Sequence, residues 1–111
     1  MDLASIQHPG GITELTLDGR LNMVTAARVR EAIHEAIVSN SPQIGVDLSR
    51  TSFLDSSGLG ALVWGLKAAR EAGGDLRLIN PTEQVVLVLD LTNMNATLQS
   101  FATLDEAYPR G

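Results

Sequence analysis

Phe53-Leu54-Asp55-Ser56-Ser57-Gly58-Leu59-Gly60 is the stretch that decides the fold, because it joins an apolar segment to a helical pattern. Upstream of it, residues 43–49 form a short apolar run between polar residues, which predicts a central strand. Downstream, the periodicity predicts a helix over residues 57–72 that ends at Gly73-Gly74. A strand that leads through a short turn into a helix is the repeating unit of open α/β sheets, whose functional residues lie at such turns.

Strands and helices alternate along the rest of the chain. Further strands are expected over residues 3–7, 12–17, 75–79 and 98–102. Further helices are expected over residues 24–39, 81–91 and 103–108. This order implies right-handed crossovers and a mixed, mostly parallel sheet of four or five strands with about four helices, in a single α/β domain over residues 1–111.

Turn and capping residues set the expected boundaries. His8-Pro9-Gly10-Gly11 is a strong turn between the first two strands, and Asp18-Gly19 is expected to close the second. Asn22 is expected to cap the first helix. Residues 85–91 are rich in β-branched side chains that also suit a strand. Because Asn80-Pro81-Thr82-Glu83 is typical of a helix start, a helix is predicted there.

The composition is that of a globular protein with few routes to metal or redox chemistry. Of the 111 residues, 44% are hydrophobic and none is cysteine, which excludes disulfides and thiolate metal sites. The net charge of -5 works against unspecific binding to nucleic acid or anionic lipid. The longest apolar run, residues 58–66, is far shorter than the roughly 20 residues of a membrane helix, and no secretory signal is visible. A cytoplasmic protein without membrane insertion is therefore expected.

The start of the helix at Asp55-Ser56-Ser57 is the most informative candidate site. The first amide groups of a helix lack intrahelical acceptors and carry about half a positive charge, which favours anions. A phosphoryl group on Ser56 could accept hydrogen bonds from those amides. Gly58 and Gly60 have no Cβ, so the backbone of another molecule could approach closely. The simpler interpretation is that Asp55 and Ser56 only cap the helix.

Trp64 is the second unusual feature. The predicted buried stripe of its helix consists of Leu59, Leu62, Val63, Leu66, Ala69 and Gly73. At about 100° per residue, Trp64 lies almost opposite that stripe, beside Ser57, Ala61 and Ala68. An exposed tryptophan among small residues suits an anchor for a partner protein. The alternative is that the first or the last element of the chain covers it.

Catalytic alternatives find little support in the sequence. A serine nucleophile needs a base, and the two histidines are His8, in a turn, and His34, on the first helix, where a solvated side chain is expected. Asp47 and Asp55 lack the adjacent acidic residues of a magnesium-dependent receiver domain. No phosphate-binding loop, dinucleotide fingerprint or nucleophile elbow is found. A nucleotide-binding domain or small hydrolase is therefore disfavoured, and we expect no enzyme activity, cofactor or metal.

Several of these segments resemble the STAS domain, which is shared by anti-sigma-factor antagonists and the tails of sulphate transporters. Asp55-Ser56-Ser57-Gly58-Leu59-Gly60 resembles the signature of that family. Leu17-Asp18-Gly19-Arg20-Leu21-Asn22 resembles its Leu-x-Gly-x-Leu-Asp turn, and residues 73–78 and 104–107 also fit its pattern. The resemblance spans residues 5–108, which is nearly the whole chain.

The resemblance implies a free-standing bacterial antagonist, because no membrane segment precedes the domain. In that family, an anti-sigma factor that is an ATP-dependent serine kinase phosphorylates the serine after the signature aspartate. The unphosphorylated antagonist binds this kinase and releases a sigma factor, which regulates transcription. A metal-dependent serine phosphatase removes the phosphate. The resemblance thus implies that Ser56 is the phosphoacceptor, with Ser57 as the second candidate.

The residues expected to contact the partner are Asp55, Ser57, Gly58, Gly60, Ala61, Trp64, Asn22 and Thr25. Two residues depart from the family pattern. Asn22 replaces the usual Asp, which is expected to alter a polar contact near the phosphorylation site. Asn93 stands where Gly is common, and Asn is the residue next best suited to a left-handed helix end.

A passive module is the competing class of function. It would be a STAS subunit of a transport complex or signalling scaffold that is never phosphorylated. Incubation with a kinase and ATP would distinguish the two, since only a switch protein gains a phosphate. Direct contact with nucleic acid is expected in neither case.

Overall fold

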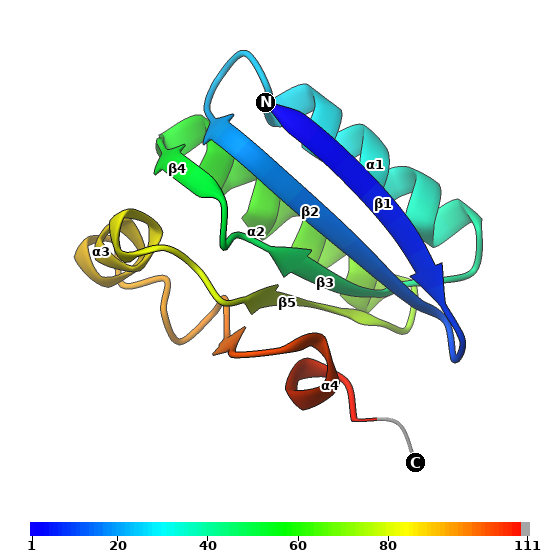
Figure 1. The fold of residues 1–111 in the computed structure, drawn as a ribbon. Helices are drawn as coiled ribbons and strands as arrows, with labels where there is room; N and C mark the ends of the chain where they lie inside the picture. Colours follow the sequence, from blue (N-terminus) through cyan, green and yellow to red (C-terminus); the bar gives the residue numbers. More distant parts are fainter. Residues whose placement is uncertain (110–111) are drawn as a thin grey trace.

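Six strands and four helices alternate along residues 1–109, which are the residues that the computed structural model describes (Figure 1). The strands are β1 (Asp2–His8), β2 (Ile12–Leu21), β3 (Gln43–Asp47), β4 (Thr51–Leu54), β5 (Asp75–Ile79) and β6 (Ser100–Phe101). The helices are α1 (Ala26–Val38), α2 (Ser56–Glu71), α3 (Glu83–Leu91) and α4 (Leu104–Ala107). The alternating order expected from the sequence is confirmed, with β4 as an additional strand.

The strands form one sheet in the order β1-β2-β3-β5-β6, and β4 pairs with the far end of β2. β1 runs antiparallel to β2, whereas all the other strand pairs are parallel. Helices α1 and α2 pack together against one face of the sheet, and α4 lies on the other face (Figure 1). The mixed, mostly parallel α/β architecture is therefore confirmed, with six strands rather than four or five. None of the described helices is long and apolar enough to cross a membrane.

The unexpected strand β4 exists because β2 is longer than the sequence predicts. Asp18-Gly19 does not close β2, since the chain continues to Leu21 through Gly19, which has a positive φ of 119°. The ladder shifts register between Gly19 and Arg20, and the extension pairs with β4. Arg20 also stacks over the Phe53 ring at 4.2 Å. A strand of four residues with an irregular register shows too little periodicity to be recognised from the sequence.

Helix α2 buries part of the stripe that its hydrophobic periodicity predicts. Leu62, Leu66 and Ala69 are buried as expected, whereas Val63 is only partly buried and Gly73 is exposed. The other buried positions are the small residues Gly58, Ala61 and Gly65. A Cβ at Gly65 would lie 2.5 Å from Ile33 Cδ1 and 2.9 Å from Leu76 Cδ1, so only glycine permits this close packing. Ala61 has no exposed surface, so its side chain is not available to a partner, contrary to the expectation. Leu59, expected in the core, is only partly buried.

Two helix starts also differ from the expected ones. Thr25 rather than Asn22 occupies the N-cap position of α1. Thr82 occupies that of α3, and Asn80 before it adopts a positive φ of 46°. The prediction of a helix rather than a strand in this region is confirmed. Asn93 has a φ of 57°, as expected for a left-handed residue at the end of α3.

A second, smaller core lies beneath α4 on the other face of the sheet. Its buried residues are Ile12, Ile79, Ala107 and Tyr108, with Phe101 and Leu104 packed against them. The Tyr108 hydroxyl donates a hydrogen bond to Ile44 O at 2.8 Å. Burial raises the pKa of Tyr108 above its ordinary value, so the neutral phenol is the form that the fold favours. These contacts fasten the C-terminal helix to the sheet.

Candidate functional site

Asp55 joins the start of α2 to the loop that follows β2. One carboxylate oxygen, Oδ1, accepts a hydrogen bond from the Gly58 amide at 2.9 Å and so caps the helix. The other oxygen, Oδ2, accepts from the Met23 amide at 3.3 Å. The Asp55 amide donates to Leu21 O at 3.3 Å. The capping role of Asp55 is therefore confirmed, and the same side chain also fixes the neighbouring loop.

Ser56 is the first residue of α2, and its side chain is exposed, whereas Ser57 is partly buried. Within residues 1–109, the Ser56 hydroxyl has no hydrogen-bond partner. The Gly58 amide already donates to the Asp55 carboxylate, and the Leu59 amide donates to the backbone carbonyl of Asp55 at 2.9 Å. The amides left without an acceptor at this helix start are those of Ser56 and Ser57. An anionic group on Ser56 would therefore meet the positive end of the α2 dipole.

Gly58 and Gly60 have different roles, although the sequence suggests close approach of a partner at both. Gly58 is buried, and a Cβ there would collide with Leu21 O and lie 2.8 Å from Leu21 Cγ. Its missing side chain serves the contact between α2 and β2, contrary to the expectation. Gly60 is exposed, and no atom lies within 4 Å of the place where its Cβ would be. Gly60 remains open to another molecule.

Asn22 and Thr25 hold the loop between β2 and α1 in shape. Asn22 Oδ1 accepts from the amides of Val24 at 3.0 Å and Thr25 at 3.3 Å. The Thr25 hydroxyl donates to Arg20 O at 2.8 Å and accepts from the Asn22 amide at 3.0 Å. An amide oxygen at position 22 accepts these bonds as a carboxylate oxygen would. The two side chains therefore support the loop mainly through its own backbone.

The same loop carries two apolar residues that the sequence analysis did not identify. Met23 is 75% exposed and Val24 is 80% exposed. The hydrogen bond from the Met23 amide to Asp55 places them beside the start of α2. Large apolar side chains that are this exposed are typical of surfaces that bind another protein. The available signal is an apolar pair directly after Asn22, of which only Val24 falls within the helix expected over residues 24–39.

Trp64 lies on the outer side of α2, and 40% of its surface is exposed. Within residues 1–109, neither the first nor the last element of the chain covers it. Ser57, Gly60 and Trp64 follow the three- and four-residue spacing that places residues on one side of a helix. We call the surface formed by Met23, Val24, Ser56, Ser57, Gly60 and Trp64 the Ser56 surface. It combines the exposed hydroxyl of Ser56 with three exposed hydrophobic side chains.

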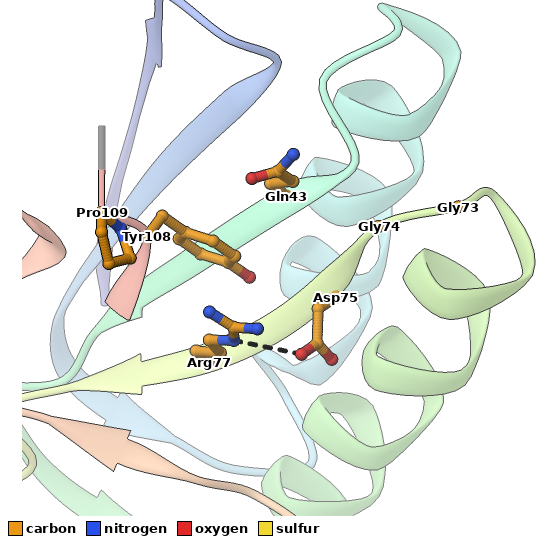
Figure 2. A pocket seen from close by; sticks show the side chains of 7 residues that line it. All are labelled: Gln43, Gly73, Gly74, Asp75, Arg77, Tyr108 and Pro109. Atoms are coloured by element: carbon orange, nitrogen blue, oxygen red, sulfur yellow. Dashed lines mark hydrogen bonds and ion pairs between the residues drawn. The ribbon is translucent and has the colours of Figure 1, made fainter. Parts of the chain in front are cut away.

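A hollow of about 310 Å³ lies at the opposite end of the sheet (Figure 2). It is lined by Gln43, Gly73, Gly74, Asp75, Arg77, Tyr108 and Pro109. Gln43 and Asp75 begin β3 and β5, whereas Ser56 follows the end of the parallel strand β4. The hollow and the Ser56 surface are therefore separate sites.

The charged side chains that line the hollow, Asp75 and Arg77, bind each other. Asp75 accepts a hydrogen bond from Arg77 Nε at 3.1 Å (Figure 2). It also accepts from Arg70 Nε at 3.1 Å and from the Leu76 amide at 3.0 Å. Arg77 also donates to Ala107 O. Partial burial acts to raise the pKa of Asp75, but the hydrogen bonds from Leu76, Arg77 and Arg70 outweigh it and hold the pKa below its ordinary value. The hydrogen bonds of Asp75 and Arg77 therefore stabilise the fold at the start of β5.

The histidines lie apart from each other and from the start of α2. His8 Nε2 lies 3.0 Å from Glu14 Oε1, at the end of β2 that is remote from Leu21 and Asp55. His34 is exposed on α1, as expected. Within residues 1–109, no group of three or more His, Asp or Glu side chains could hold a metal ion.

Comparison with known proteins gives consistent matches. The family model of the STAS domain matches residues 4–107. The anti-sigma-B factor antagonist of Bacillus subtilis is 26% identical over 81 residues, which cover 73% of this chain and 73% of the relative. The crystal structure of an anti-sigma factor antagonist from Mycobacterium paratuberculosis has a TM-score of 0.82 at 25% identity, covering 96% of this chain and 89% of that chain. The Bacillus cell fate determinant SpoIIAA in the phosphorylated form has a TM-score of 0.74 at 23% identity, covering 96% of each chain.

Proposed function

The chain belongs to the STAS domain family, and we propose that it is an anti-sigma factor antagonist switched by phosphorylation of Ser56. In its unphosphorylated form it binds an anti-sigma factor that is also a serine kinase, and a sigma factor is thereby released. This is a binding function in the cytoplasm and not an enzymatic one. The proposal is supported by the relatives that carry the name anti-sigma factor antagonist.

The exposed hydroxyl of Ser56 is the observation that carries the proposal. A kinase must reach the oxygen that it phosphorylates, and Ser56 is exposed at the first position of α2. The neighbouring Asp55 is held by two backbone amides, so it keeps the helix start in place. Ser57 is partly buried, which makes it the second candidate.

The proposed modification is a transfer of the γ-phosphoryl group of ATP. The Ser56 oxygen forms a bond to the γ-phosphorus, the bond between that phosphorus and the bridging oxygen of ADP breaks, and the hydroxyl proton passes to a base of the kinase. The phosphate carries about -1.5 to -2 charges at neutral pH. The positive end of α2 stabilises this charge, so the fold persists. SpoIIAA in its phosphorylated form has a similar fold.

The same charge is proposed to prevent binding. Met23, Val24 and Trp64 offer apolar contact area around Ser56, which suits a partner that covers the site and removes it from water. A partner surface that fits a neutral hydroxyl would then bury a poorly paired dianion beside Asp55, at a cost of several kcal/mol. A loss of about 3–4 kcal/mol already weakens binding by a few hundredfold. A serine phosphatase would restore binding by hydrolysing the phosphate ester.

Two substitutions at Ser56 test the proposal. Ser56→Asp should weaken binding to the anti-sigma factor by at least about a hundredfold, whereas Ser56→Ala should bind as the unmodified protein does, and both should retain the melting temperature. Ser100→Asp adds the same charge at an exposed position on β6 and serves as the matched control. If Ser56→Asp binds as tightly as Ser100→Asp, exclusion by charge is wrong and a passive STAS module becomes the better account.

A further inference from the structure

Strand β1 is an open edge of the sheet. It pairs with β2 and lies at the end of the strand order (Figure 1). Residues 4–7 in its middle are all exposed. The outward backbone groups of such a strand have no partner in their own sheet and can form a ladder with another strand.

The edge carries few of the features that usually prevent such pairing, and its one carboxylate, Asp2, lies at the end of the strand. Its seven residues, DLASIQH, include no lysine, arginine or proline. Its register with β2 runs without a bulge from Asp2 opposite Asp18 to His8 opposite Ile12. Ile6 is 52% exposed, so an apolar side chain also lies uncovered on this strand.

We propose that β1 pairs antiparallel with β1 of a second copy of this chain, about a two-fold axis at Ser5. In a register centred on Ser5, Asp2 lies opposite His8 of the second copy, and Ala4 lies opposite Ile6 of the second copy. Asp2, Ala4, Ile6 and His8 alternate along β1 with Leu3, Ser5 and Gln7, so these four side chains lie on the same face of the sheet. The pairing is therefore geometrically consistent.

The side chains favour this register over its neighbours. With the axis at Ser5, each Asp2 carboxylate lies opposite His8 of the second copy, where Nδ1 is the ring nitrogen left for it because Nε2 is already paired with Glu14. Each Ile6 is covered by an Ala4 methyl group. Moving the axis to Ala4 places Asp2 opposite Ile6. Moving it to Ile6 brings the two Ile6 side chains together but leaves Asp2 without a partner. Both shifts also shorten the ladder from seven pairs to five. The register centred on Ser5 is the one that combines the Asp2–His8 pair, a cover for Ile6 and the longest ladder.

The dimer leaves the Ser56 surface free. β2 pairs with β1 along one edge and with β4 along the other, and Ser56 follows β4. A ladder of two seven-residue strands buries less area than most stable interfaces, so a dissociation constant between micromolar and millimolar is expected. Because the two surfaces do not overlap, dimerisation is independent of the proposed switch, and Ser56→Asp should leave it unchanged.

Disulfide formation tests the register, since the natural chain has no cysteine. Opposed residues of antiparallel strands have Cα atoms about 4.5–5.5 Å apart, within the range of a disulfide. Under air with a copper catalyst, Ser5→Cys should form a linked dimer at least ten times faster than Gln7→Cys, whose two copies would lie roughly 13 Å apart. Ser52→Cys, exposed on β4, is the control for random collision. Equal rates at all three positions, or faster linkage at Gln7→Cys, would overturn the proposal.

Sedimentation of the unmodified chain tests the dimer itself. Dimers should appear as the concentration rises, and Ile6→Lys should weaken the association about tenfold or more. Val38→Lys adds the same charge at an exposed apolar residue of α1 and should have no effect. A chain that stays monomeric at millimolar concentration, that binds another protein through β1 instead, or that dimerises equally well with Ile6→Lys contradicts the proposal.

Discussion

Asp55 and Asp75 both accept hydrogen bonds from backbone amides at an end of the sheet, yet their surroundings differ. Asp55 binds only amides, those of Gly58 and Met23, and its neighbours include an exposed hydroxyl and exposed apolar side chains. Asp75 additionally binds two arginines, one of which stacks over the Tyr108 ring at 4.6 Å.

The surroundings of Asp55 suit a surface that binds another protein, whereas those of Asp75 stabilise the fold. Around Asp75, the chain satisfies its own charges and covers its own aromatic ring, so little is left for a partner. Around Asp55, the chain fixes the backbone but leaves hydroxyl and apolar groups open to solvent. Substitutions near Asp75 should therefore change stability, and substitutions on the Ser56 surface should change partner binding.

The largest expected effect concerns the backbone beneath the Ser56 surface. Gly58→Ala should lower the free energy of unfolding by about 2–3 kcal/mol, because its Cβ collides with Leu21 O. Gly60→Ala has open space and should raise stability by about 0.5–1 kcal/mol, as alanine favours a helix over glycine. Chemical denaturation measures both. If the two variants are equally stable, the close contact between α2 and β2 is misplaced.

The next effect concerns Tyr108, at the end of the sheet that holds Asp75. Tyr108→Phe removes the hydroxyl that binds Ile44 O and should lower the free energy of unfolding by about 1.5 kcal/mol, because a buried carbonyl loses its donor. Affinity for the anti-sigma factor should not change. Thermal melts and calorimetric titration measure the two quantities. A weaker affinity at unchanged stability would show that the partner contacts this end instead.

A smaller effect is expected at Trp64. Trp64→Ala should reduce partner affinity by about 1 kcal/mol or more, since exposed aromatic residues are frequent anchors of interfaces. The melting temperature should stay nearly constant, because the side chain is 40% exposed. Leu87→Ala, at an exposed leucine on α3, is the control for general loss of apolar surface. A large fall in melting temperature would place Trp64 in the core.

The smallest effect is a pH dependence at Asp75. Its pKa is lower in the folded chain than the ordinary value of 3.8, so its contribution to stability is complete above that value and is lost as the pH falls through the folded pKa. Asp75→Asn should therefore be less stable than the natural chain by about 0.5 kcal/mol at neutral pH, because the arginine partners are partly exposed. The difference should shrink as the pH falls below 3.8 and through the lower pKa of the folded chain. A constant difference would exclude the ionised carboxylate as its cause.

The order of elements could be predicted from the sequence because turn residues and hydrophobic periodicity are local signals. Asp55 as a helix cap and Trp64 as an outward residue follow from the same local rules. β4 could not be predicted, because it depends on the extension of β2 past Gly19.

The inner side of α2 also depends on tertiary contacts. Hydrophobic periodicity predicts that the most apolar residues of α2 are buried. At Gly58, Ala61 and Gly65, however, the small size of the residue lets this side of α2 pack closely against the rest of the chain. For this reason Gly58 and Ala61 were expected at the surface and lie in the core. Val24 is expected within the first helix, whereas the helix begins after the N-cap at Thr25, which leaves Met23 and Val24 exposed in the loop.

Transfer of phosphate to Ser56 tests the central claim most directly. The chain is incubated with ATP and the serine kinase encoded nearest to its gene, and the intact mass and the modified residue are determined by mass spectrometry. The account predicts one added phosphoryl group, located on Ser56 and absent from Ser56→Ala, with Ser57→Ala still modified. Modification that persists in Ser56→Ala, or a chain that gains no phosphate from a kinase to which it binds, would contradict it.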